Sequence, residues 1–109
     1  MAETALDRVF GALAHPTRRA ILARLRRGPA SVNELAAPFR VSQQAISKQI
    51  AVLREAGLIT QVKQGRESPC ELSLPALRQA DDWMDLYRPL WDERFDKLAD
   101  YLDHQASEK

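Results

Sequence analysis

The 109-residue sequence predicts a single, mainly α-helical domain with one β-hairpin. Apolar residues recur at steps of three and four before residue 57 and after residue 75, which is helical periodicity. Between these segments the period changes to two on either side of a glycine, which is typical of a hairpin. The length suffices for one hydrophobic core but not for two. The expected order is therefore four helices, two strands and a final helix.

The first two helices are marked by the residues at their ends. Apolar spacing predicts a first helix over residues 4–14. Pro16 suits the first position of a second helix, because no amide donor is needed there. We interpret His15, at the junction, as a capping or hydrogen-bonded structural residue. Gly28 and Pro29 then break the second helix.

A very short connection joins the third and fourth helices. Ser31 and Glu34 have the spacing of a capping box, which begins a third helix that ends near Phe39. Ser42 is a good N-cap for the next helix, and Gly57 suits its end because glycine adopts the left-handed conformation at little cost. Two helices joined by so few residues cross at a steep angle, as in a helix-turn-helix.

The hairpin follows this pair. Residues 58–64 and 69–74 are predicted strands around a turn that contains Gly65. Pro69 cannot donate to a ladder, so it belongs at a strand start or edge.

One long helix ends the chain, opened by Pro75 and predicted over residues 76–104. Pro89 lies inside it, removes one backbone hydrogen bond and crowds the carbonyl of Asp85. We therefore expect a kink or a break near residues 87–88.

This final helix carries more apolar surface than one small domain needs to bury. Such a stripe, left exposed, would favour aggregation. We assign it, with part of the first helix, to an isologous interface between two copies of the chain. The residues expected at that interface are Leu6, Val9, Phe10, Trp83, Tyr87, Trp91, Phe95, Leu98 and Leu102.

The charges are unevenly distributed although the net charge is only +1. Residues 17–70 hold ten bases and three acids, a net of +7, whereas residues 71–109 hold ten acids and five bases, a net of −5. This asymmetry points to a polyanionic partner for the middle of the chain. Surface arginines that merely solvate helices are the alternative interpretation.

The runs HPTRRAIL, SVNELA and VSQQAISKQIAVLREAGLI, with the hairpin after them, resemble the ArsR family of bacterial winged helix-turn-helix repressors. The resemblance extends from about residue 6 to residue 102. It implies a single winged helix-turn-helix domain over residues 1–109, with residues 76–104 as the dimerisation helix. It also implies a homodimer that represses transcription by binding a palindromic operator in double-stranded DNA, as a cytoplasmic, nucleoid-associated protein.

By the same resemblance, residues 42–56 are the recognition helix. A glutamine amide can pair with adenine, and lysine favours guanine or phosphate. Lys63 and Arg66 lie on the wing, and Arg18 and Arg19 are candidate phosphate contacts. Arg54 is equally well explained as a partner of Glu55 or Glu34. The expected DNA-binding residues are Ser42, Gln43, Gln44, Ser47, Lys48, Arg54, Lys63, Arg66, Arg18 and Arg19.

Metal sensing, known in part of this family, receives little support from the sequence. The helix SVNELAAPF has no cysteine, and we expect no metal and no cofactor. Two alternatives stay open: an Asp100–His104 site shared across a dimer, and a sensing role for Cys70, which we interpret as a packed thiol. Expression level or a small apolar effector could regulate the protein instead.

Other functional classes are weaker still. No catalytic motif is present, so we expect no enzyme activity. No apolar run is long enough to span a membrane, and the single cysteine fits a reducing cytoplasm. A winged helix that binds proteins rather than DNA is the competing non-enzyme function.

Overall fold

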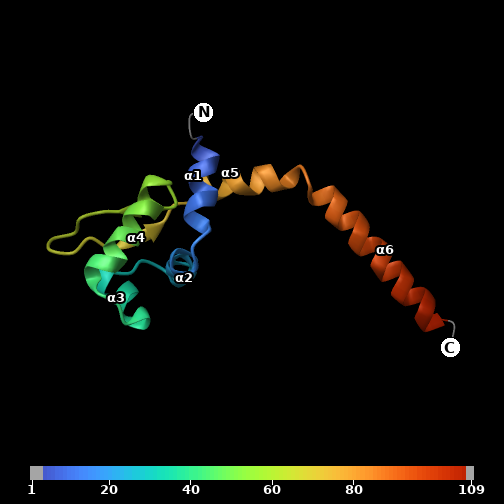
Figure 1. The fold of residues 1–109 in the computed structure, drawn as a ribbon, viewed down its shortest axis with the longest axis horizontal. Coiled ribbons are helices and arrows are strands. Elements are labelled where there is room, and N and C mark those ends of the chain that lie inside the picture. The colour runs from blue at the N-terminus through green and yellow to red at the C-terminus, as the bar shows by residue number, and fades with distance from the viewer. Residues whose placement is uncertain (1–3, 108–109) are drawn as a thin grey trace.

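The computed structural model describes residues 4–107, with the side chains of residues 4–105, and Figure 1 shows its arrangement. The elements in chain order are α1 (Ala5–Leu13), α2 (Pro16–Leu25), α3 (Val32–Ala36), the 3₁₀ turn η1 (Ala37–Phe39), α4 (Gln43–Glu55), β1 (Ile59–Gln61), β2 (Cys70–Leu72), α5 (Leu74–Asp85) and α6 (Arg88–Ser107). The predicted order is confirmed. The two strands are shorter than predicted, because only three residue pairs form the ladder.

Side-chain caps fix where the first four helices begin. The Ser31 hydroxyl accepts from the Glu34 amide at 3.1 Å while the Glu34 carboxylate accepts from the Ser31 amide, which confirms the capping box. The Ser42 hydroxyl accepts from the Ala45 amide at 3.1 Å and starts α4. His15 caps α2, since its Nδ1 accepts from the Thr17 amide at 3.2 Å. The structural interpretation of His15 is therefore confirmed.

The core lies where α1, α2, α3, α4 and α5 meet the hairpin. No polar residue among the described side chains is buried there. The largest side chains with almost no exposed surface are Val9, Ile21, Leu35, Ile46, Ile50, Leu53, Leu58, Ile59 and Cys70. Burial of this apolar set is the main contribution to the stability of the fold.

The hairpin is attached to the helices at its base. β1 and β2 pair antiparallel, with Ile59 opposite Leu72 and Gln61 opposite Cys70. Ala30, between α2 and α3, adds a bridge on the other side of β2: the Cys70 amide donates to the Ala30 carbonyl at 2.8 Å. The wing, residues 62–69, extends beyond this base and turns at Gly65, whose φ is 62°.

The predicted interruption of the last helix is present. α5 ends at Asp85 and α6 begins at Arg88, one residue before Pro89. Across the break, Arg88 pairs with Asp81 at 2.6 Å and with Asp85 at 2.7 Å. α5 starts at Leu74, two residues before the predicted position, because Pro75 lies within its first turn rather than ahead of it.

α6 leads away from the rest of the molecule as an arm (Figure 1), and the structure measures 66 Å along its longest axis. Every described side chain of α6 is exposed. None of the helices in residues 4–107 has the length and apolar character needed to cross a bilayer.

Candidate DNA-binding surface

α4 presents two contrasting faces. Its apolar side chains Ile46, Ile50 and Leu53 are buried in the core. The exposed residues at its capped N-terminus and along the other side are Ser42, Gln43, Gln44, Ser47 and Lys48. The first turn has no acid, so the helix dipole and the free amides leave this end favourable for a phosphate.

The connection from α3 to α4 bends sharply at Arg40. Its φ is 54°, the only positive φ at a non-glycine residue in the part of the chain that the structure describes. A left-handed conformation costs a residue with a Cβ about 1–2 kcal/mol. This turn lets α4 start after only three intervening residues, 40–42, and cross α3. Neither glycine nor asparagine marks the position, so the turn could not be predicted from residue type.

The wing places further bases beside α4. Lys63 and Arg66 are exposed on the hairpin, as predicted. Arg54 donates from Nη1 to Gln61 Oε1 at 2.7 Å, and Gln61 donates from Nε2 to the Ser68 carbonyl at 3.1 Å. The guanidinium of Arg54 therefore joins α4 to the base of the wing.

The partner that the structure gives Arg54 is Gln61, and one of the two acids suggested for it, Glu34, pairs elsewhere. Glu34 lies beside Arg24, at 3.3 Å. Arg54 stays exposed and keeps other N–H donors, so its position near the wing is compatible with a phosphate contact.

Arg18 and Arg19, two of the expected phosphate contacts, donate to carbonyls of their own chain. Arg18 donates from Nε to the Ala12 carbonyl at 2.7 Å, from Nη2 to the Gly11 carbonyl at 3.1 Å and from Nη1 to Gln49 Oε1 at 2.8 Å. Arg19 donates from Nη1 to the Leu13 carbonyl at 2.7 Å. Both guanidinium groups bind the C-terminal carbonyls of α1, which a helix leaves without partners of its own. Arg18 is thus an internal connection rather than a free phosphate contact.

Comparisons with known proteins agree with this geometry. A family model described as a helix-turn-helix domain matches residues 13–62, from the end of α1 into the wing. The transcriptional repressor SdpR of Bacillus subtilis (strain 168) is 30% identical over 79 residues, which cover 72% of this chain and 88% of that protein. A crystal structure of the ArsR family transcriptional regulator RHA00566 is 40% identical, with a TM-score of 0.74 over 84% of this chain and 97% of that one. The chain belongs to the ArsR family of winged helix-turn-helix transcriptional regulators.

A third relative matches over a shorter length. The HTH-type transcriptional regulator Rv2034 of Mycobacterium tuberculosis is 49% identical over 53 residues, 49% of this chain and 50% of that protein. The aligned part of this chain thus spans about half of that relative. These three relatives are named as regulators of transcription, not as enzymes.

The surface expected to carry dimer contacts in this ArsR-family chain is exposed, with one exception. Trp83, Tyr87, Trp91, Phe95, Leu98 and Leu102 form an exposed apolar stripe along α5 and α6, and Phe95 is 68% exposed. Phe10 of α1 extends the apolar stripe, since its ring lies 5.4 Å from that of Trp83, edge to face. Leu6, also on α1, is half-buried.

Val9 is the exception, and its assignment to the interface was wrong. Its side chain has 0% exposed surface and belongs to the core of its own chain. Val9 lies one residue before Phe10 on α1, but about 100° away around the helix, so the two side chains serve different sides. The sequence pattern alone could not separate them.

Cys70 has the environment of a structural thiol. It is fully buried in the hairpin, and burial raises the pKa of its thiol, although nearby Arg54 acts in the opposite direction. A buried thiol with a raised pKa is a poor nucleophile and a poor metal ligand. This agrees with the interpretation of Cys70 as a packed residue.

Carboxylates close enough to share an ion occur at Asp81, Asp82 and Asp85 in the described chain. Arg88 already pairs with two of them, and all three are exposed. Such a group resembles an ordinary charged surface more closely than a transition-metal site, which would include imidazole or thiolate ligands.

Proposed function

We propose that the chain acts as a homodimeric repressor that binds a palindromic operator in double-stranded DNA. The observation that carries the proposal is the exposed polar face of α4. That face combines glutamine, serine and lysine at a capped helix N-terminus with the basic wing beside it. An α-helix of this kind fits the major groove, where glutamine can pair with adenine and lysine with guanine.

The proposed division of labour follows from chemistry and position. Gln43, Gln44 and Ser47 would read base edges, and Lys48 would reach guanine or a phosphate. Lys63, Arg66 and Arg54 would contact the backbone, which strengthens binding without selecting a sequence. The acidic stretch after residue 71 would keep the phosphates at the basic middle of the chain.

The apolar stripe supports the homodimer in this proposal. A row of exposed tryptophan, tyrosine, phenylalanine and leucine on an isolated monomer would be an aggregation hazard. Pairing two such stripes about a two-fold axis buries them and sets two recognition helices about 34 Å apart, one turn of DNA. The SdpR relative is named as a repressor, which supports repression as the outcome. A cytoplasmic, nucleoid-associated location follows from the same proposal.

The experiment that tests the function selects duplexes from a random pool with the purified wild-type protein. We expect an imperfect palindrome, bound by a dimer, with log Kd changing linearly with log salt and a slope of several units. A pool that yields no preferred sequence, together with binding that salt does not weaken, would contradict the proposal and favour the protein-interaction alternative.

The same operator tests the proposed absence of metal regulation. Since the chain offers no cysteine pair, operator affinity in the presence of zinc, cadmium or copper should equal that in a chelator. A change of about tenfold or more would return attention to Asp100, His104 and Cys70.

A further inference from the structure

We propose that Arg18 is a positioning residue that holds the recognition helix α4 at a fixed orientation to α1, and thereby sets the half-site spacing that the dimer accepts. The inference rests on the proposed function, because it needs two recognition helices reading one operator. It assigns Arg18 a role other than direct contact with DNA.

Arg18 directs its hydrogen bonds away from its own helix. Arg18 lies in the first turn of α2, yet its three bonds leave α2 altogether. Two go to α1, at the Gly11 and Ala12 carbonyls, and the third goes to Gln49 of α4. One side chain thus joins three helices.

A guanidinium group at the C-terminus of α1 makes this connection stiff. The carbonyls at the end of α1 carry the negative end of the helix dipole, so a cation is favoured there. A guanidinium group is planar and presents its donors in fixed directions, unlike the flexible ammonium of lysine. The bonds from this cation are therefore both charge-assisted and directional.

Gln49 connects Arg18 to the exposed reading face of α4. It follows Lys48 directly on α4 and is half-buried, between the core residue Ile50 and the exposed reading face. A movement of Gln49 relative to α1 would carry the reading face with it, because α4 is a continuous helix over thirteen residues.

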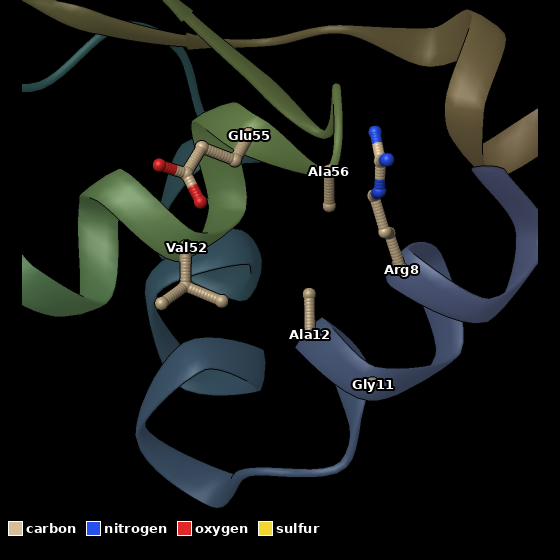
Figure 2. A pocket seen from close by; sticks show the side chains of 6 residues that line it. All are labelled: Arg8, Gly11, Ala12, Val52, Glu55 and Ala56. Carbon is tan, nitrogen blue, oxygen red and sulfur yellow. The ribbon is translucent and has the colours of Figure 1, made fainter. Parts of the chain in front are cut away.

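The packing of α1 against α4 leaves a space between the two helices. Figure 2 shows a pocket between these helices, and its volume is about 380 Å³. Arg8, Gly11 and Ala12 of α1 line it on one side, and Val52 and Glu55 of α4, with Ala56 just after that helix, line it on the other. Where this hollow separates them, α1 and α4 make fewer of the packing contacts that would resist rocking of one helix against the other. The Arg18–Gln49 bond supplies a directional restraint that packing does not.

A fixed orientation of α4 matters for the dimer rather than for the single domain. α1 also carries Phe10, whose ring packs edge to face on Trp83 of the apolar stripe. The chain of contacts therefore runs from the proposed dimer interface through α1 and Arg18 to α4. Freedom at Arg18 would let each α4 tilt, and two tilting helices would tolerate operators whose half-sites are closer together or further apart.

The test measures spacing preference. The duplex selected by the wild-type protein is compared with versions whose central spacer is one base pair longer or shorter, and with unrelated duplex DNA. Wild type should lose about tenfold or more in affinity for either altered spacer, whereas Arg18→Ala should lose roughly threefold or less relative to its own operator affinity. Its affinity for unrelated DNA should stay within about twofold of wild type, because the phosphate-binding residues remain.

Matched variants separate positioning from general damage. Gln49→Leu should reproduce the relaxed spacing, and Gln49→Glu should retain the wild-type preference because a carboxylate still accepts from the guanidinium. Arg19→Ala removes a neighbouring arginine that binds only α1, and should keep the preference as well. A simple loss of folded protein would lower the affinity for every duplex by one factor and leave the spacing ratio unchanged, which would overturn the inference.

The Arg18–Gln49 hydrogen bond can also be tested without DNA, by measuring melting temperatures. The melting temperature of Arg18→Ala combined with Gln49→Leu should be lowered no further than that of Arg18→Ala alone, since both remove the same bond. Additive decreases would refute the Arg18–Gln49 connection. If wild type selects no operator while the decreases are non-additive, the proposed function fails and the positioning bond stands.

Discussion

The body of the molecule, residues 4–85, and its arm, α6, contain apolar residues at similar helical spacing but bury them differently. In the body, Ile46 and Leu53 have 0% exposed surface and pack inside one chain. In the arm, Trp91 and Phe95 are 48% and 68% exposed. The same sequence pattern therefore serves an internal core in one region and, as we propose, contact with a second copy of the chain in the other.

The largest expected effect contrasts one leucine from each region. Leu53→Ala should lower the free energy of unfolding by about 2–5 kcal/mol, because it removes a fully buried side chain and leaves a cavity. Leu98→Ala removes the same atoms from the arm, where the side chain is half exposed. At protein concentrations low enough to populate monomer, it should change the stability of the body little. Denaturant titrations of both variants over a range of concentrations check this, and equal losses at high dilution would contradict the contrast.

The next effect assigns sequence reading to the body. Gln44→Ala should cost about 1–3 kcal/mol at one base position and relax the preference there. Lys63→Ala should weaken binding to all duplexes alike and reduce the salt slope by about one. Gln79→Ala, which removes an exposed amide from α5, is the matched control and should alter neither. Titrations of operator and random DNA distinguish these outcomes; an equal loss on both for Gln44→Ala would remove it from the base-reading set.

The smallest effect is a pH dependence confined to the body. The Ser31 backbone amide and then its hydroxyl stabilise the charged Glu34 carboxylate, which lowers the pKa of Glu34 in the folded protein. Because the folded pKa lies below the unfolded one, this contribution is present above the unfolded pKa and is lost as pH falls through the folded pKa. Glu34→Gln retains a capping acceptor without the charge, so it should flatten the fall of the melting temperature with acid. The change should not depend on protein concentration; a concentration-dependent change would place the effect at the dimer interface instead.

Local signals in the sequence were sufficient for most of the body. Caps at Ser31 and Ser42 act within three residues, so they could be read from spacing alone. Pro89 foretold the break between α5 and α6 for the same reason, since its effect on the backbone is local. The left-handed turn at Arg40 carried no such signal, because arginine is not one of the residue types that favour this conformation.

The candidate site was predicted less completely, because partners distant in sequence decide the role of a charged side chain. The exposed face of α4 followed from helical periodicity. Arg18, however, binds Gln49, 31 positions away, and Arg54 binds Gln61 across the wing. Neither pairing could be predicted from the order of residues in the sequence. Val9 and Phe10 show the same limit for the apolar stripe, where neighbouring residues face different partners.

We propose that a second copy of the chain covers the arm, and that operator binding requires this dimer. Removing two aromatic rings from the arm tests both statements. Sedimentation and operator titration are measured at matched concentrations for wild type and for Trp91→Ala combined with Phe95→Ala. The control combines Asp96→Ala with Asp100→Ala, two exposed acids on the opposite face of α6. We expect the aromatic variant to sediment as a folded monomer and to lose operator binding, while the control remains dimeric and bound. An aromatic variant that stays dimeric and binds its operator like wild type would contradict the account.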